Sequence, residues 1–205
     1  MGNNLANAAA TNGMAGNTKS ILLVGVGGQG TILASKLLTV GLMEKGFDVK
    51  MSEIHGMSQR GGAVSSQVRY GGEVHSPVIE LGGADILVSF EKMEALRWLE
   101  YLKKGGKAVV NDYEINPMPV IMGKRDYAPD ILDEIRAVAD TVAVAASEEA
   151  EKLGNGKIMN IILLGTIVKL TGLESMDWER IIRENVKQQF AEQNILALKK
   201  GISMI

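Results

Sequence analysis

A glycine-rich segment near the start of the chain has the spacing of a phosphate-binding loop. Its sequence is GVGGQG, which matches G-x-G-x-x-G, and it directly follows the apolar run 20–24. In dinucleotide-binding folds such glycines allow a tight turn, backbone approach to a phosphate and close helix–strand packing. The helix that follows offers free N–H groups to an anion. The candidate site residues of this segment are Gly25, Gly27, Gly28, Gln29 and Gly30. The alternative is that the glycines serve only a crowded strand–helix junction.

An acidic residue stands at the distance that a dinucleotide site requires. Glu53 lies 23 residues after Gly30, where an acid at the end of the second strand would hydrogen-bond a ribose. This spacing favours a nucleotide-binding function, and we treat Glu53 as a candidate site residue.

The segment 53–62, EIHGMSQRGG, is predicted to be a loop with several polar groups among glycines. These groups suit an anionic ligand or a polar partner surface. His55 titrates near neutral pH, but the sequence offers no second catalytic residue, so a hydrogen-bonding structural histidine is the preferred interpretation. Arg60 is either a fork for phosphate or carboxylate or a salt-bridged surface residue. The candidate residues here are Glu53, His55, Ser58, Gln59, Arg60, Gly61 and Gly62.

Hydrophobic periodicity predicts the elements that position these loops. A strand over 20–26, a helix over 29–45 and a strand over 47–52 form one βαβ unit. A β-hairpin with arms 63–70 and 73–78 is inserted next, followed by strands at 84–90, 108–111 and 141–145. We therefore predict an α/β fold with a Rossmann-like, mostly parallel sheet flanked by helices. The glycine loop and the 53–62 loop are expected to meet at the carboxyl edge of this sheet.

The chain divides into three predicted parts. Residues 1–18 are expected to be a disordered leader, residues 19–155 the Rossmann-like core, and residues 156–205 a helical C-terminal extension of the same domain. Within the core, a helix is predicted from about Glu91 to Lys104, with acids at its first turn. In the extension, Asp177 is predicted to cap a helix.

Composition excludes several classes of function. The 205 residues carry 22 basic and 24 acidic side chains, a net charge of −2 that argues against nucleic-acid binding. The absence of cysteine excludes disulfides, cysteine-ligated zinc and an iron–sulfur cluster held by this chain. The chain has only two histidines, so we expect no His-rich metal centre and predict no metal site. No apolar run is long enough to span a membrane and the start lacks a secretory pattern, so we expect a cytoplasmic protein.

Five segments in this order carry a resemblance to a known family. They are GVGGQGTILASKLL, EIHGMSQRGGAVSSQVRYG, SPVI at 76–79, ADILVSFEKMEALR and NIILL at 160–164. Together they resemble the gamma-type domain of 2-oxoacid:ferredoxin oxidoreductases. With its helical tail, the chain is most similar to the free-standing beta subunit of indolepyruvate ferredoxin oxidoreductase. HGMSQRGG is specific to this resemblance, whereas the glycine loop alone is not.

The resemblance implies a subunit of an enzyme that oxidatively decarboxylates aryl 2-oxoacids to an acyl-CoA and CO2 while reducing ferredoxin. It implies that thiamine diphosphate and the iron–sulfur clusters belong to a larger partner subunit, with CoA as co-substrate. This chain is then expected to bind no cofactor and to be inactive alone. The loops 27–30 and 55–62 would line the surface that faces the partner's thiamine site or the CoA path. Two alternatives remain open: an autonomous NAD- or FAD-binding oxidoreductase, and a non-enzymatic nucleotide sensor or scaffold.

Overall fold

The computed structural model describes residues 18–56 and 62–205. The strands are β1 (Lys19–Val26), β2 (Asp48–His55), β3 (Ala63–Gly71), β4 (Ala84–Ser89), β5 (Leu102–Asn111) and β6 (Asp140–Val144). The helices are α2 (Thr31–Glu44), α3 (Lys92–Arg97), α4 (Met118–Ile121), α5 (Ile131–Arg136), α6 (Ala146–Lys152), α7 (Met159–Thr171), α8 (Trp178–Asn185) and α9 (Ala191–Ile202). The predicted leader 1–18 lies outside the described residues except for Thr18.

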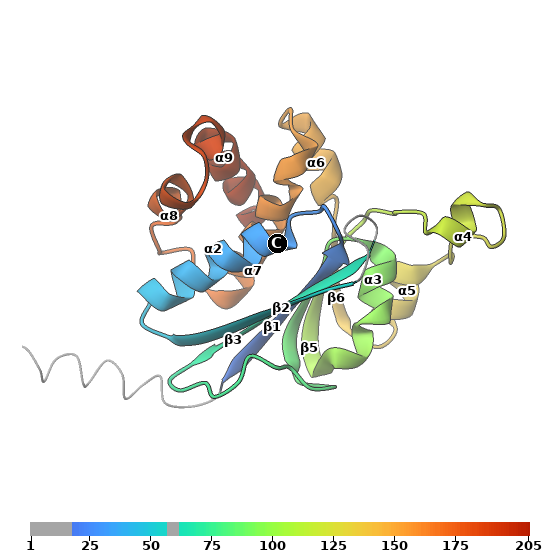
Figure 1. The fold of residues 1–205 in the computed structure, drawn as a ribbon, viewed down its shortest axis with the longest axis horizontal. Helices are drawn as coiled ribbons and strands as arrows, with labels where there is room; N and C mark the ends of the chain where they lie inside the picture. Colours follow the sequence, from blue (N-terminus) through green and yellow to red (C-terminus); the bar gives the residue numbers. More distant parts are fainter. Residues whose placement is uncertain (1–17, 57–61) are drawn as a thin grey trace, which may run out of the picture.

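The strands form one sheet with the order β2-β3-β1-β4-β5-β6. The neighbours β1, β4, β5 and β6 pair in parallel, whereas β3 pairs antiparallel with both β1 and β2. Helix α2 and the C-terminal helices cover one face of the sheet, and α3 and α5 cover the other (Figure 1). The predicted α/β class with a mostly parallel, helix-flanked sheet is therefore confirmed.

The largest core cluster lies between the sheet and the α2 face. Strand β1 is apolar on both faces and its residues 21–24 are fully buried, as expected for a central strand of a parallel sheet. Helix α7 is buried along most of its length and joins this cluster together with α8 and α9. Gly165 and Gly201 allow α7 and α9 to cross closely, because a Cβ at Gly201 would lie 1.9 Å from the Ile162 carbonyl oxygen. Residues 156–205 thus share their core with the sheet.

The segment 73–78 does not form the predicted return arm of a hairpin. Side chains of the sheet bind its backbone instead: Asp48 accepts from the Val74 N–H at 2.8 Å, and the Arg69 guanidinium donates to the carbonyls of Ser76 and Val78. Pro77 also removes one of the donors that a strand ladder needs. The hairpin that the sheet does contain is formed by β2 and β3.

The predicted βαβ unit is also modified. Strand β3 lies between β1 and β2, so the two parallel strands of the unit are not neighbours. Strand β2 continues through His55, which places Glu53 and His55 in the strand rather than in the predicted loop. Further along, the helix predicted over 91–104 ends at Arg97, because Leu102 already pairs with Ala84 as the start of β5.

Other local predictions are confirmed. Asp177 caps α8, with its carboxylate accepting from the Arg180 N–H at 3.1 Å. Glu91 caps α3, with its carboxylate accepting from the Glu94 N–H at 2.9 Å. Within the two described ranges, none of the helices combines the length and the apolar character that a membrane crossing needs.

Candidate functional site

The glycine loop joins β1 to α2 at the carboxyl edge of the sheet. Packing requires glycine at two of its positions: a Cβ at Gly25 would lie 2.9 Å from the Cβ of Phe90, and one at Gly30 would lie 2.4 Å from the Asn160 amide nitrogen. Gly28 also has a positive φ, of 102°, but among the described residues beyond its chain neighbours no atom lies within 4 Å of a Cβ built there. The junction therefore explains Gly25 and Gly30, whereas the described part of the chain leaves space beside Gly28.

The side chain of Gln29 crosses the gap between the ends of β1 and β4. Its Nε2 donates to the Phe90 carbonyl at 2.9 Å, and its Oε1 accepts from the Val26 N–H at 2.7 Å. The connections after these two strands run to opposite faces of the sheet, α2 on one side and α3 on the other, and ligands of open α/β sheets bind at such a switch point. Here the Gln29 side-chain amide spans that crevice. It also occupies the Val26 N–H, a backbone donor that would otherwise be available to a phosphate.

Glu53 does not occupy the place of a ribose-binding acid beside the glycine loop. Strand β3 separates β2 from β1, which moves the acid about 5 Å further from the loop than in a fold where the two strands pair. The Glu53 carboxylate instead accepts from the Ser35 hydroxyl of α2 at 3.1 Å and lies 3.9 Å from the His55 Nε2. The sequence spacing fits a dinucleotide site, but the topology gives Glu53 contacts within the protein.

His55 and the glycine loop do face one another, as the sequence predicts. The Gly27 N–H donates to the Gly62 carbonyl at 2.8 Å, which ties the loop after β2 to the glycine loop. A cavity of about 460 Å³, the His55 cavity, lies between them. Its lining residues are Gly27, Gly28, Gly30, Thr31, Ile32, His55, Gly56 and Val64. The His55 side chain is half-exposed. The predicted residues Ser58, Gln59, Arg60 and Gly61 lie outside the described residues.

A second cavity, of about 470 Å³, opens on the other side of the glycine loop. Gly28 and Gln29 line it together with Asp112, Tyr113 and Ser147 at the ends of β5 and β6. We call it the Asp112 cavity. Gly28 is shared by both cavities, so this open glycine stands between two hollows at the carboxyl edge of the sheet.

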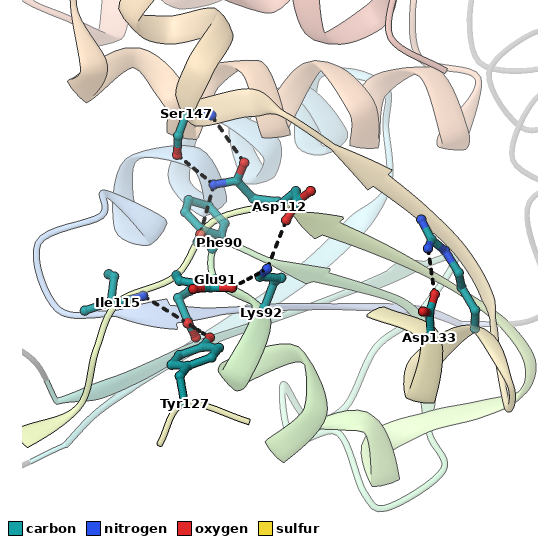
Figure 2. Close-up of polar contacts among 11 residues, drawn as sticks. Phe90, Glu91, Lys92, Asp112, Ile115, Tyr127, Asp133 and Ser147 are labelled. Atoms are coloured by element: carbon teal, nitrogen blue, oxygen red, sulfur yellow. Dashed lines mark hydrogen bonds and ion pairs between the residues drawn. The ribbon is translucent and has the colours of Figure 1, made fainter. Parts of the chain in front are cut away.

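The Phe90 carbonyl, directly after β4, accepts hydrogen bonds from two side-chain amides. Besides Gln29, the buried Asn111 at the end of β5 donates to it at 3.1 Å, a bond that Figure 2 draws between Phe90 and Ser147. The Asn111 Nδ2 also donates to the Ser147 hydroxyl at 2.9 Å, and its Oδ1 accepts from the Ser147 N–H at 3.2 Å. Four segments of the carboxyl edge are therefore joined through one backbone oxygen and one asparagine.

The Glu91 carboxylate, near the same edge of the sheet, accepts three hydrogen bonds. The residue is 1% exposed, and its carboxylate accepts from the Glu94 N–H. The carboxylate also accepts from the Ile115 N–H and from the Tyr127 hydroxyl (Figure 2). Burial and the adjacent Glu91 carboxylate raise the pKa of the Tyr127 phenol well above its usual range. Tyr127 therefore stays protonated and acts as a donor. These hydrogen bonds hold the start of α3 and the segment 112–130, which carries α4.

Burial also affects Lys92 and Glu94 near this network. Burial lowers the pKa of the Lys92 amine, but its contacts with Glu114 at 2.6 Å and Asp112 at 3.2 Å outweigh burial, and the net pKa is raised. Burial raises the pKa of Glu94, whose Oε1 accepts from Arg97 at 2.8 Å. Neither Lys92 nor Glu94 lines the His55 cavity or the Asp112 cavity.

Sequence reasoning did not single out Asn111, Ser147 or Tyr127. One signal was present for Asn111, since a polar residue that ends a predicted apolar strand is placed at the carboxyl edge. No comparable signal marks Tyr127, which lies 36 residues after its partner Glu91.

Comparison with known proteins shows the family to which the chain belongs. The family model described as "Pyruvate ferredoxin/flavodoxin oxidoreductase" matches residues 20–204. The chain belongs to this family. It is 38% identical over 190 residues to the indolepyruvate oxidoreductase subunit IorB of Archaeoglobus fulgidus, with 89% of this chain and 92% of the relative covered. It is 29% identical over 190 residues to the 2-oxoglutarate synthase subunit KorC of Methanothermobacter marburgensis, with 91% and 96% covered.

Two solved structures of oxoacid ferredoxin oxidoreductases share the fold. The gamma subunit of the keto/oxoacid ferredoxin oxidoreductase of Geobacter sulfurreducens matches with a TM-score of 0.66 and 25% identity, covering 91% of this chain and 97% of that one. The 2-oxoglutarate:ferredoxin oxidoreductase of Magnetococcus marinus matches with a TM-score of 0.73 and 18% identity, covering 92% of this chain but 31% of that one. In the second protein the fold is thus one part of a much longer chain.

The predicted resemblance to this oxidoreductase family is confirmed. The relatives named above are subunits of oxidoreductase and synthase enzymes. This chain has no cysteine, and the described residues contain no group of three His, Asp or Glu side chains placed to hold a metal ion. The residues present therefore do not fit an iron–sulfur cluster.

Proposed function

We propose that the chain is the small subunit of a 2-oxoacid:ferredoxin oxidoreductase that oxidatively decarboxylates indolepyruvate or another aryl 2-oxoacid to acyl-CoA and CO2. The observation that carries this proposal is the identity to an indolepyruvate oxidoreductase subunit, which extends over most of both chains rather than over one motif. The lower identity to a 2-oxoglutarate synthase subunit favours the aryl substrate class.

Thiamine diphosphate and the iron–sulfur clusters belong, in this proposal, to a larger partner subunit. Support comes from the absence of cysteine here and from the longer Magnetococcus chain, in which this fold accounts for only part of the length. In this proposal the chain itself transfers no electrons. Ferredoxin is reduced through the complex, and the small subunit alone is inactive.

A protruding apolar segment supports the need for a partner. Helix α4 extends away from the body of the molecule (Figure 1), and Met118, Ile121 and Met122 on it or next to it are each more than half exposed. Apolar side chains gathered on a projecting turn are typical of a protein–protein contact. We assign this segment, the α4 arm, to the interface with the larger subunit.

The His55 cavity is the place where this chain completes the partner's active site. The α2 N-terminus and the open Gly28 offer backbone N–H groups to an anion, and His55 supplies a half-exposed imidazole on the opposite wall. This set suits an anionic group of the substrate or of CoA better than a dinucleotide, because Gln29 already bridges the switch-point crevice. The chain's contribution is to position the anion and exclude water at the boundary of the two subunits.

Co-expression with the larger subunit tests the proposal. We expect 2-oxoacid- and CoA-dependent reduction of a viologen dye only when both chains are present, with indolepyruvate preferred to 2-oxoglutarate and pyruvate. Arg60→Ala is expected to lower this activity while leaving the folded fraction unchanged. Full activity of the larger subunit alone would overturn the assignment. Micromolar NAD binding to the isolated chain by calorimetry would favour the autonomous dehydrogenase instead.

A further inference from the structure

A groove lies between α2, the start of α7 and the segment that joins α8 to α9, and its volume is about 490 Å³. The apolar part of its wall consists of Leu33, Ile158, Val186 and Phe190. Phe190 is 41% exposed, so the described part of the chain leaves much of this side chain uncovered. Apolar side chains gathered in a hollow of the surface are typical of a place where a partner packs.

Two lysines give this groove, which we call the Lys187 groove, a positive charge. Lys157 and Lys187 are exposed lining residues, and no acidic residue is among those that line the groove. In the described part of the chain neither lysine forms an ion pair. Glu149 of the adjoining helix α6 is already paired, since its carboxylate lies 2.9 Å from the Lys200 Nζ. The groove therefore complements a partner that carries negative charge.

Two asparagines add hydrogen-bond acceptors to the same groove. Asn185 and Asn194 line it, and the Nδ2 of each donates to a carbonyl four residues earlier, at 2.9 Å and 2.7 Å. This leaves the Oδ1 of each as the free end of the amide, and among the described residues no donor contacts either oxygen. An extended peptide presents backbone N–H groups that need such acceptors.

The Lys187 groove adjoins the α4 arm through shared lining residues. Lys157 lines both this groove and the Asp112 cavity. Ile115, in the segment that carries α4, lines the Asp112 cavity as well. A protein that covers the α4 arm and the Asp112 cavity therefore reaches the edge of this groove.

We propose that the Lys187 groove docks an extended acidic segment of the larger subunit. An apolar side chain of that segment packs against Val186 and Phe190, and its carboxylates face Lys157 and Lys187. The contact then has an apolar centre and a charged rim, as protein interfaces commonly do. A small anion alone would leave the apolar wall uncovered, and an uncharged segment would leave the lysines unmatched. This inference rests on the proposed function, because the larger subunit is the partner.

Charge reversal tests the electrostatic part of this contact with the full chain and the larger subunit. The double variant Lys157→Glu, Lys187→Glu should bind the larger subunit at least about tenfold more weakly in surface plasmon resonance at low salt, and the difference should shrink at high salt. The matched control is Lys104→Glu, an exposed lysine of β5 that lines neither the groove nor the two cavities. It should bind like the parent, and all variants should keep the urea midpoint of the parent.

A single introduced cysteine identifies the occupant of the groove, because the chain has no cysteine of its own. Gln188→Cys places a thiol on an exposed residue directly after Lys187, and this thiol is labelled with benzophenone maleimide before the subunits are mixed. We expect light to cross-link this label to a peptide of the larger subunit in which an apolar residue stands beside Asp or Glu. The same label on Lys104→Cys should give at least about tenfold less of this product.

Three results would overturn the inference. The first is equal affinity of the larger subunit for the parent and the double lysine variant, and the second is equal cross-linking from positions 188 and 104. The third is cross-linking to a second copy of this chain or to a segment without acidic residues. An active complex with any of these results would contradict this inference alone. A complex that docks through the groove but shows no 2-oxoacid-dependent dye reduction would contradict the proposed function alone, and absence of any binding to the larger subunit would contradict both.

Discussion

The side-chain amide of Gln29 donates to the backbone carbonyl of Phe90 at 2.9 Å and so joins the turn after β1 to the end of β4. The same carbonyl accepts from Asn111 at the end of β5. The crevice in which open α/β sheets place their ligands is therefore held by the protein's own side chains, and the cavities lie to either side of the bridge. The glycines form the turn between β1 and α2, and the two cavities beside this turn are lined by His55 on one side and by Asp112 on the other.

Replacement of Gln29 by alanine should destabilise the chain. The Val26 N–H loses its acceptor and the Phe90 carbonyl loses one of its two donors, which costs about 1–3 kcal/mol of the free energy of unfolding. Urea denaturation of the full chain measures this loss. Gln188→Ala is the matched control, since Gln188 is exposed and makes no side-chain hydrogen bond within the described residues, and it should change stability by less than about 0.5 kcal/mol. Equal stability of the two variants would show that the bridge contributes nothing.

Alanine substitutions in the glycine loop should separate packing from backbone conformation. Gly30→Ala combines a positive φ of 81° with a Cβ placed 2.4 Å from the Asn160 amide, whereas Gly28→Ala has the φ of 102° and open space. We expect Gly28→Ala to cost about 1–2 kcal/mol from conformation alone and Gly30→Ala clearly more. Thermal and urea unfolding check the order.

A suitable control for both loop variants is Gly46→Ala after α2. Gly46 has a φ of 93°, and no atom of the described residues beyond its chain neighbours lies within 4 Å of a Cβ built there. The stability lost in Gly46→Ala should therefore match that lost in Gly28→Ala. If Gly30→Ala is no worse than Gly46→Ala, the close packing of Asn160 on the loop does not limit the residue at position 30.

Local patterns predicted most of the elements but not the pairing of β3. Alternation, caps and glycine stops are short-range signals, and they predict the positions of β1 and β4 and the cap of α8 closely. The partner of a strand is a long-range choice, and in β3 the alternating residues Ser65 and Gln67 are as buried as their apolar neighbours. The local Gly71-Gly72 turn signal therefore suggested a hairpin on the wrong side of β3.

The candidate site was predictable to a similar degree. The facing of the glycine loop and His55 follows from where parallel strands end, and the structure places both on one cavity. The bridge at the Phe90 carbonyl does not follow, because a backbone acceptor has no sequence signature. The pairing of Asn160 with Gly30, residues 130 positions apart, was equally inaccessible to spacing arguments.

Asp85 should make stability depend on pH in the acid range. Burial would raise the pKa of its carboxyl, but the Lys103 amine at 2.6 Å and the Ser20 N–H at 2.9 Å outweigh burial and hold it below the usual value of 3.8. A pKa that is lower in the folded state stabilises the protein above 3.8, and this stabilisation is lost as the pH falls through the folded value. Asp85→Asn should therefore be less stable than the parent by about 1–2 kcal/mol at pH 7, with the difference shrinking toward pH 3.

Urea denaturation between pH 3 and pH 7 measures this difference. Asp126→Asn is the control, because Asp126 is exposed and, in the described part of the chain, forms no ion pair. A pH-independent difference between Asp85→Asn and the parent would contradict the role of the charged carboxylate.

The α4 arm should matter to assembly and not to folding. Met118 and Ile121 are each 64% exposed, so replacing them by serine removes apolar surface that the isolated chain does not bury. We expect the double variant to unfold within about 0.5 kcal/mol of the parent and to co-purify poorly with the larger subunit, with the affinity measured by surface plasmon resonance falling at least about tenfold. Val138→Ser is the control, since Val138 is 72% exposed after α5 and away from the arm, and it should leave both properties unchanged. Unaltered affinity of the Met118 and Ile121 double variant would place the contact with the larger subunit elsewhere on the molecule, and equal losses in the double variant and Val138→Ser would indicate a general effect of surface polarity.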